Sequence, residues 1–337
     1  SLPISSGISG IRTNNGQFRN RGLEIEVTAK PIETKDWKWN ISGNIAYNKN
    51  TVAKLPDNGL ELNRQGSYQV YSGKDQTDLK WVGGYQEGQE PGVLYVYQAD
   101  GIYKNESEIP NNMIVKPAAV QGATTRTLYG KADWAAMTEA QKIASKGLPI
   151  QLGDVKWKDV NGDGTITADD RTFIGNPLPD FTFGFTLNLE YKNFDLLVFG
   201  QGAVGNQIFQ GLRRLDIDNA NYQTEALGRW TGEGSSNTYP RLTTNDTNKN
   251  FNNPSDFYLE DGDYFRFKTI QFGYSLPSSI LEKASIAQAR VYLTGENLFT
   301  FTKYSGYDPE IGGGVMGIDR GFYPQAKTFM LGVNLQF

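Results

Sequence analysis

Residues 181–191 read FTFGFTLNLEY, in which apolar or aromatic residues occupy every second position and polar residues or glycine lie between them. The same period of two closes the chain in 329–337, FMLGVNLQF. Because successive side chains of a β-strand point to opposite faces, both stretches predict strands with one apolar and one polar face. We predict further strands of this kind at 23–28, 37–48, 194–204, 263–275 and 288–299.

The amino-acid composition of the chain excludes several classes of enzyme and binding protein. The chain has 337 residues, a net charge of −4, and neither cysteine nor histidine. This composition excludes zinc–thiolate clusters, thiol nucleophiles and histidine-based catalytic triads. The acidic balance also argues against a nucleic-acid partner. The sequence has no run of 18 apolar residues, which excludes a membrane-spanning helix, whereas alternating strands can cross a membrane without a hydropathy peak.

Strand length and aromatic placement separate two kinds of all-β fold. A strand of about ten residues, rising roughly 3.3 Å per residue at a tilt near 45°, spans the ~25 Å apolar band of an outer membrane, whereas sandwich strands are commonly about half as long. Aromatic residues gather at the ends of the predicted strands, as expected at a membrane–water boundary. Filling of a protein core by aromatic residues is the alternative explanation. The predicted connections at 31–36, 191–193 and 276–287 are short, whereas those at about 50–180, 205–262 and 300–325 are long.

We therefore predict an all-β fold, a transmembrane antiparallel β-barrel with long extracellular loops. The polar faces of the strands carry large charged side chains such as Glu24, Lys38 and Arg266, which need a wide, water-filled interior. Seven or eight strands would close only a narrow barrel, so we interpret 1–337 as one unit of a larger barrel. The lipid-facing positions predicted from the alternation are Phe183, Phe185, Leu187, Leu331 and Val333.

Residues 159–170, DVNGDGTITADD, have the ligand spacing of a calcium-binding loop. Oxygen ligands fall at loop positions 1, 3, 5, 7 and 12, and a glycine at position 6 permits the sharp turn around Ca²⁺. The motif resembles dockerin-type calcium loops and predicts a structural Ca²⁺ in an external loop. A turn stabilised by its own Asx and glycine residues is the alternative. The predicted ligands are Asp159, Asn161, Asp163, the backbone carbonyl of Thr165, and Asp170.

The sequence contains two other patterns, an amphipathic stretch and pairs of acidic residues. One helix is predicted at 131–147, where Trp134, Met137 and Ile143 lie on a narrow apolar stripe. Acidic pairs such as Asp308 and Glu310 can in principle serve as acid and base in glycoside hydrolysis, but no pattern brings them together in a cleft. We interpret them as solvated loop residues and predict no enzymatic activity.

Several segments, taken in order, resemble the C-terminal third of the SusC/RagA family of TonB-dependent outer-membrane transporters of Bacteroidetes. They are 14–32 (NNGQFRNRGLEIEVTAKPI), 92–109, 153–202, 257–277, 291–310 (VYLTGENLFTFTKYSGYDPE) and 323–337 (YPQAKTFMLGVNLQF). The resemblance implies a barrel of about 22 strands, an N-terminal plug, a TonB box and a SusD-type lipoprotein lid. The plug and the TonB box are absent from this sequence. We therefore expect 1–337 to be the C-terminal piece of a longer transporter, cut naturally or otherwise at Ser1, with the N-terminal barrel and plug portion as its nearest partner.

The resemblance also implies a function, namely energised import across the cell outer membrane. A ligand, either an oligosaccharide or a peptide, is held between lid and barrel until TonB opens the plug, and this chain supplies barrel wall and extracellular loops in contact with outer-membrane lipid. Two rivals remain open: a secreted calcium-stabilised β-domain that binds or hydrolyses carbohydrate, and a passive diffusion porin. Loop aromatics can stack on sugar rings, although packing within the loops is the expected role of most of them. The candidate substrate-binding residues are Trp81, Tyr85, Tyr95, Tyr97, Trp230 and Tyr239.

Overall fold

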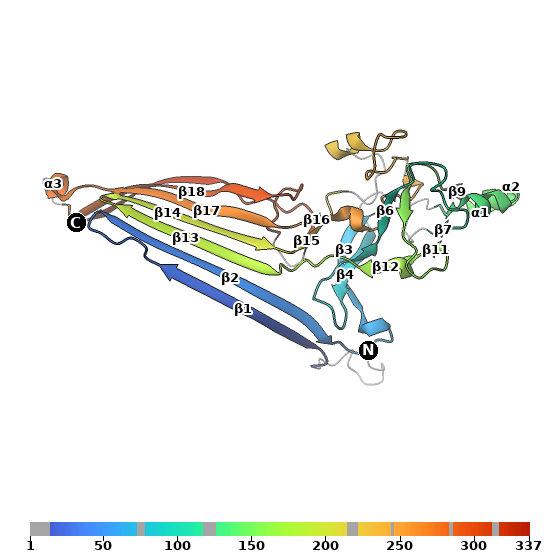
Figure 1. Cartoon of the computed structure of the whole chain (residues 1–337), viewed down its shortest axis with the longest axis horizontal. Coiled ribbons are helices and arrows are strands. Elements are labelled where there is room, and N and C mark those ends of the chain that lie inside the picture. The colour runs from blue at the N-terminus through green and yellow to red at the C-terminus, as the bar shows by residue number, and fades with distance from the viewer. Residues whose placement is uncertain are drawn as a thin grey trace, which may run out of the picture.

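The computed structural model describes residues 14–72, 78–116, 126–213, 222–243, 246–282, 286–311 and 317–337. Its central element is a seven-stranded sheet in which every neighbouring pair is antiparallel (Figure 1). In spatial order the strands are β1 (Gln17–Ala29), β2 (Trp37–Lys54), β13 (Phe181–Tyr191), β14 (Phe194–Val204), β17 (Tyr264–Ser275), β18 (Gln288–Thr302) and β20 (Thr328–Gln336). The predicted all-β antiparallel fold is confirmed.

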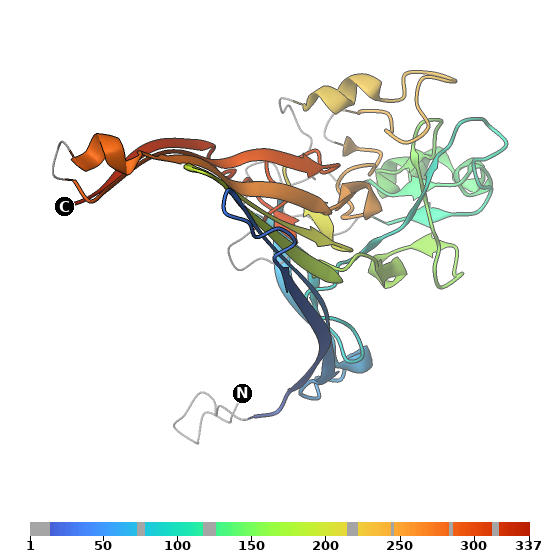
Figure 2. The same ribbon diagram turned by 60° about the vertical axis from the view of Figure 1, so that its left-hand side comes forward.

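The sheet is curved and open. Figure 2 shows it bending between β1 on one side and β18 and β20 on the other. Among the described residues, β1 and β20 are edge strands with one neighbour each. The described part of the chain therefore does not close into a barrel by itself, as expected for a piece of a larger wall.

Strand register places the alternating apolar residues of the seven strands on one side of the sheet, here called the apolar face, although Leu197 and Phe199 of β14 lie on the other side. Ile25 of β1 lies opposite Ile45 of β2, and Ile45 lies opposite Phe183 of β13. At the other edge, Leu331 of β20 lies opposite Leu293 of β18. Because a shift of one residue would turn a whole strand over, this register is strongly specified by the pattern.

The polar face carries the alternate residues. One row across five strands consists of Glu26, Asn44, Gly184, Gln201 and Arg266. Such a row needs water or polar partners, because burying charged groups against hydrocarbon costs several kcal/mol.

The two ends of the sheet differ. The short connections, the short helix α3 (Ser278–Leu281) and the C-terminus lie at one end, and the long loops gather at the other (Figure 1). The two ends are called the turn end and the loop end. This asymmetry is typical of outer-membrane barrels, with short turns on the periplasmic side and long loops outside.

The long loops fold into structures of their own. One hydrophobic cluster comprises Val82, Leu94, Val96, Phe209, Tyr258 and Ile318, and a second is built around Tyr103, Leu128, Trp157 and Ile166. The loop strands are β3 (Gln65–Ser72), β4 (Asp78–Tyr85), β5 (Tyr95–Tyr97), β6 (Ala99–Ile102), β7 (Ile114–Val115), β8 (Leu128–Tyr129), β9 (Leu148–Pro149), β10 (Val155–Trp157), β11 (Thr165–Ile166), β12 (Arg171–Phe173), β15 (Gln207–Gln210), β16 (Leu259–Asp261) and β19 (Ile318–Asp319). The 3₁₀ helices are Glu61–Asn63, Ala168–Asp170, Thr224–Gly228 and Asp256–Tyr258.

The single helix predicted at 131–147 is wrong. The chain forms α1 (Lys131–Ala136) and α2 (Glu139–Ser145) instead. Thr138 starts the second helix with a capping box, in which its side chain and that of Gln141 bind each other's backbone N–H. Trp134 and Met137 are half-buried, and Trp134 packs against Tyr129 at 6.1 Å, whereas Ile143 is 76% exposed, so only the first part of the expected apolar stripe packs within the loop. No helix of the described residues has the length and apolar character needed to cross a membrane.

Candidate functional site

Aromatic rings form rows near both ends of the sheet. At the turn end the rings of Trp37 and Tyr191 lie 4.2 Å apart between centroids. At the loop end Tyr47 and Phe181 pair at 5.3 Å. About ten residues of β2 separate Trp37 from Tyr47, which corresponds to roughly 33 Å along the strand and ~23 Å at a 45° tilt. This spacing matches the ~25 Å apolar band between the aromatic girdles of outer-membrane barrels.

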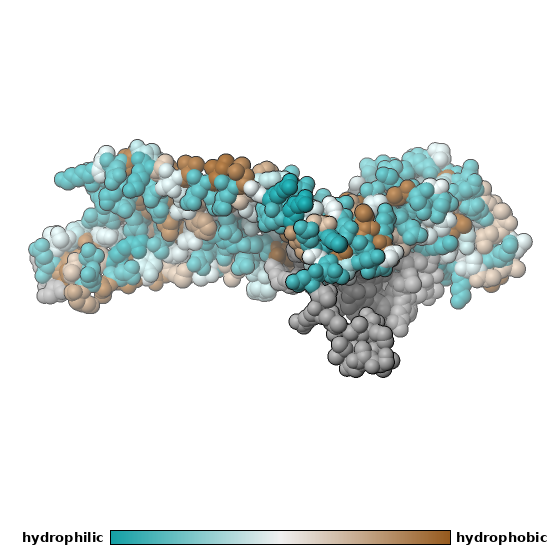
Figure 3. Space-filling view, turned by 90° about the horizontal axis from the view of Figure 1, so that it is seen from below, coloured by the Kyte–Doolittle hydropathy of each residue, from teal (hydrophilic) through white to brown (hydrophobic). Residues whose placement is uncertain are grey.

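The five predicted lipid-facing residues lie on the apolar face between these rows. Leu331 and Val333 are 76% and 57% exposed. Phe183, Phe185 and Leu187 are half-buried by their neighbours in the sheet. The ring of Phe183, for example, stacks on that of Phe265 at 6.0 Å. Figure 3 shows brown, apolar residues at the surface of the sheet. Exposed side chains of this size are costly in water, so the face needs an apolar neighbour.

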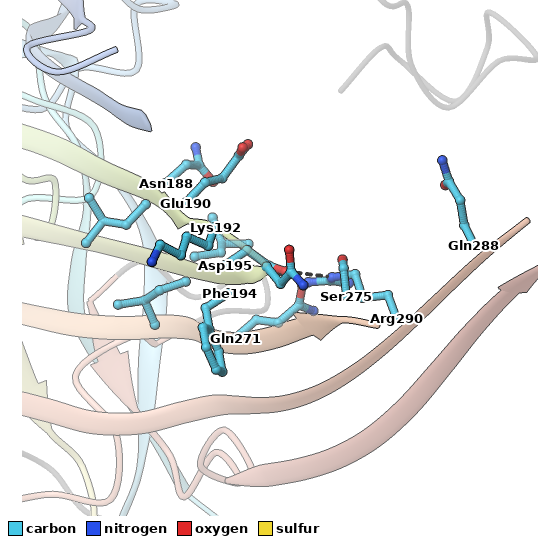
Figure 4. A pocket seen from close by; sticks show the side chains of 13 residues that line it. Asn188, Glu190, Lys192, Phe194, Asp195, Gln271, Ser275, Gln288 and Arg290 are labelled. Atoms are coloured by element: carbon cyan, nitrogen blue, oxygen red, sulfur yellow. Dashed lines mark hydrogen bonds and ion pairs between the residues drawn. The ribbon is translucent and has the colours of Figure 1, made fainter. Parts of the chain in front are cut away.

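The polar face at the turn end holds a pocket of about 760 Å³ (Figure 4). Arg290 of β18 forms an ion pair with Asp195 of β14, and its Nη2 also donates to Gln271 Oε1 at 2.9 Å. Nearby, Lys38 Nζ lies 2.9 Å from Glu190 Oε2 in an exposed ion pair. The pocket is therefore lined by charged and polar side chains, of which Arg290 and Asp195 are paired across strands, and the interior of an outer-membrane barrel is polar in the same way.

A buried ionic network ties the last long loop to the polar face at the loop end. Arg266 of β17 is 3% exposed. Its guanidinium donates to Thr300 Oγ1 at 2.8 Å, to Glu310 Oε2 at 2.9 Å and to Asp308 Oδ1 at 2.6 Å. Lys268 Nζ reaches the same Glu310 oxygen at 2.6 Å. Charge-assisted bonds of this kind are stronger than neutral ones and fix geometry, so the loop is held against the wall.

The interpretation of Asp308 as a solvated loop residue is therefore wrong. Its side chain is 6% exposed, and its Oδ2 accepts a bond of 2.8 Å from the backbone N–H of Gln325. Burial alone would raise the pKa of Asp308, but the hydrogen bonds from Arg266, Gln325 and Glu310 lower it below its ordinary value. With both carboxylates bound to cations, the pair is arranged for structure and not for acid–base chemistry.

The calcium-type loop folds around its own polar groups. Asp159 accepts from the backbone N–H groups of Gly162 and Gly164, at 2.8 and 2.7 Å. Asp163 Oδ1 accepts from Thr165 N, and Asn161 Oδ1 accepts from Asp163 N. These bonds leave carboxylate lone pairs, so the donor types fit Ca²⁺.

Asp170 closes the loop from its other end. It is fully buried, and its two oxygens accept from Val160 N and Thr167 N at 2.9 and 2.7 Å. Among the described residues, no group of three or more His, Cys, Asp or Glu is arranged as a metal site. The loop thus has the predicted residues and turn, held by backbone donors.

Known proteins share this arrangement. The chain is 31% identical over its whole length to the TonB-dependent receptor P3 of Formosa agariphila, and 29% identical to the TonB-dependent receptor SusC of Bacteroides thetaiotaomicron. The structure of the RagAB peptide transporter superposes on the whole chain with a TM-score of 0.65 at 23% identity. The chain belongs to the SusC/RagA family of TonB-dependent receptors. It spans about 30% of the length of these curated relatives, covering 30% of P3 and 28% of SusC.

Two further results bear on this SusC/RagA segment. No protein-family model matches the chain. The relatives are named as receptors and transporters, and not as enzymes. The prediction that the chain is not an enzyme accords with these names.

The candidate substrate-binding aromatics of this receptor segment are mostly engaged with protein. Tyr97 is 2% exposed and belongs to the second loop cluster. Tyr85 packs edge-on against Phe18. Tyr95 is half-buried, with the guanidinium of Arg64 at 4.2 Å from its ring centroid. The side chain of Trp81 lies outside the described residues.

Trp230 and Tyr239 are brought together, because Trp230 N donates to Tyr239 O at 2.9 Å. Trp230 also covers Gly153, where a Cβ atom would come within 2.4 Å of its ring. Tyr239 packs against Phe257 at 5.3 Å, and burial raises the pKa of its hydroxyl. Both rings are half-buried, so packing explains most of their contacts.

Proposed function

We propose that this chain forms the C-terminal strands and extracellular loops of a barrel in the cell outer membrane that imports nutrients with energy supplied through TonB. One observation carries the proposal, namely that register keeps an apolar face and a polar face separate across seven strands. Lipid contacts the apolar face, with Phe183, Phe185, Leu187, Leu331 and Val333 outward, and water fills the bore on the other side.

The remaining strands and the plug come from the rest of the receptor. This is supported by the open edges of β1 and β20, whose unpaired backbone groups need neighbouring strands. It is also supported by the chain's share of the relatives' length. In this proposal 1–337 is one segment of the barrel, and a SusD-type lipoprotein closes the loop end.

The imported substrate is an oligosaccharide or a peptide. The loop aromatics Tyr85, Tyr95, Trp230 and Tyr239 are half-buried, so each leaves part of its ring exposed. These exposed parts are compatible with either class, because aromatic rings pack on sugar faces and on peptide side chains alike. The solved relative is named as a peptide transporter, which favours testing peptides beside oligosaccharides.

The experiment is an uptake assay with the complete receptor. Cells are compared with and without functional TonB, and the purified receptor is examined for a bound lipoprotein and ligand. Uptake that requires TonB and a co-purifying lipoprotein support the proposal. Uptake that continues unchanged without TonB indicates a passive porin, and a chain recovered without detergent indicates the secreted β-domain.

We also propose that 159–170 binds a structural Ca²⁺. The support is the carboxylates of Asp159, Asp163 and Asp170 in one loop, with Gly164 in a left-handed conformation (φ +76°) at the sharp turn. Limited proteolysis of the receptor is followed with Ca²⁺ and with chelator, in the native protein and in Asp159→Asn. An exposed loop residue elsewhere, as in Asp57→Asn, is the control. Protection by Ca²⁺ that only Asp159→Asn loses supports the site, and protection independent of Ca²⁺ shows a self-stabilised turn.

A further inference from the structure

A group of basic residues lies on the apolar face just beyond the loop-end aromatic row. Arg19 and Arg21 of β1 have the same strand parity as Leu23, Ile25 and Val27, so they point to the same side. Lys49 of β2 lies directly opposite Arg21 in the register. These three residues, Arg19, Arg21 and Lys49, are called the basic patch.

The patch lies immediately above the apolar band. The next residue pair toward the turn end on this face is Leu23 opposite Tyr47, and Tyr47 belongs to the loop-end aromatic row. Leu23 is 64% exposed and Tyr47 38%. Within one pair of residues the surface therefore changes from hydrocarbon-like to strongly cationic.

On the polar side of β1 and β2, at the same height, side chains contact the loops of the protein. Phe18 contacts Tyr85 of the β3–β4 hairpin at 6.0 Å, and Val52, opposite Phe18 in the register, is fully buried. Loops thus contact part of the polar side at this height, where Phe18 is still 58% exposed, and Arg19, Arg21 and Lys49 are all exposed on the other side.

The three cations are not neutralised within the described protein. None of them forms an ion pair with another described residue. Glu90 is close enough for Lys49 to act on its pKa, but burial keeps that pKa raised, and the Glu90 carboxylate is bound by Asn176.

Placing these charges together has an energetic cost without an anion. Like charges directly opposite on neighbouring strands destabilise the pair, because their Cβ atoms are only about 4.5–5.5 Å apart. Arg19 stands two residues from Arg21 on the same face, roughly 7 Å along the strand. Three donors at this spacing match a phosphate group, which arginine binds in a bidentate manner.

We propose that Arg19, Arg21 and Lys49 bind the phosphate of an anionic lipid headgroup in the leaflet at the loop end. The occupant is a membrane lipid because the patch continues the apolar face, so the acyl chains of the same molecule lie along Leu23, Ile25 and Val27. A bound phosphate removes the repulsion between Arg21 and Lys49 and fixes the height of β1 in the bilayer.

The test uses the complete receptor in detergent with lipids of stated headgroup. Binding of phosphatidic acid and of phosphatidylcholine is measured by native mass spectrometry, for the native receptor and for Arg19→Gln/Arg21→Gln/Lys49→Gln. Lys104→Gln/Lys146→Gln/Lys158→Gln is the matched control, because it removes the same charge from exposed loop positions.

We expect the native receptor and the control to retain phosphatidic acid over phosphatidylcholine, and the patch variant to lose roughly a hundredfold in affinity, about fivefold for each basic group near an anionic surface. Added inorganic phosphate is the second arm and should displace the lipid only weakly. The proposal is overturned if both triple variants bind phosphatidic acid alike. Equal retention of the two lipids, or complete displacement by inorganic phosphate, overturns it as well.

Discussion

Removal of the Arg266 guanidinium should loosen the last long loop locally while the sheet stays intact. Arg266→Met leaves Asp308 buried at 6% exposure without its charged partner. Breaking a buried ion pair costs about 3–5 kcal/mol. Asp308 keeps backbone donors from Glu310 and Gln325, at 2.9 and 2.8 Å, so we expect the lower end, ~3 kcal/mol.

Those two backbone N–H groups are also the reporters. Hydrogen exchange of the Glu310 and Gln325 amides should accelerate roughly 100-fold, because each 1.4 kcal/mol of local opening is tenfold in the equilibrium. Lys38→Met is the control, since it breaks an ion pair whose side chains are 58% and 54% exposed, and it should leave these amides unchanged. Unaltered exchange in Arg266→Met would refute the reasoning that this network holds the loop.

Three further outcomes follow from the structure. Leu331→Arg should lower the free energy of unfolding of the receptor in lipid vesicles by about 2–4 kcal/mol, measured by denaturant unfolding. Asn334→Arg, on the polar face of the same strand, should lower it far less. Equal losses for the two variants would contradict the assignment of faces. Gly153→Ala should lower the free energy of unfolding by roughly 1–3 kcal/mol and alter the fluorescence of Trp230, because the new Cβ would lie 2.4 Å from that ring. Gly59→Ala is the control, since Gly59 also has a positive φ but has open space around it, so this variant shows the effect of backbone strain without the clash. Because the folded pKa of Asp308 lies below the ordinary 3.8, its contribution is fully present above that pH and is lost as the pH falls through the folded value. The protection of the Gln325 amide, measured as its exchange rate relative to an unstructured amide at the same pH, should therefore fall in acid in the native receptor and not in Asp308→Asn.

The alternation of apolar and polar residues was sufficient to predict where the strands of the seven-stranded sheet lie. The stretch at 194–204 was predicted with the bounds of β14, and β13 and β17 pair with that strand along almost its whole length. The prediction for 263–275 missed one detail, since the alternation changes phase at Lys268, where the register with β14 and β18 shifts. Such a bulge re-aims a side chain, and here Lys268 reaches Glu310.

Contacts between segments that are distant in the sequence could not be predicted from local sequence patterns. Asp308 and Arg266 are 42 residues apart, and no periodicity relates a loop carboxylate to a strand arginine. The helix break at Thr138 did have a local signal, because Thr138 and Gln141 have the spacing of a capping box. The loop aromatics were predicted to be stacking surfaces from their residue type alone. Residue type does not show which of them the folded loops bury, and Tyr97 is one that they do bury.

The most direct test of the membrane wall is a cysteine scan of β20 in the complete receptor, since this chain has no cysteine of its own. Single cysteines from Phe329 to Leu335 are labelled with a fluorophore in lipid vesicles and exposed to a quencher confined to the bilayer. The account predicts strong quenching at 329, 331, 333 and 335 and weak quenching at the residues between them. Uniform quenching along the strand, or the opposite alternation, would contradict it.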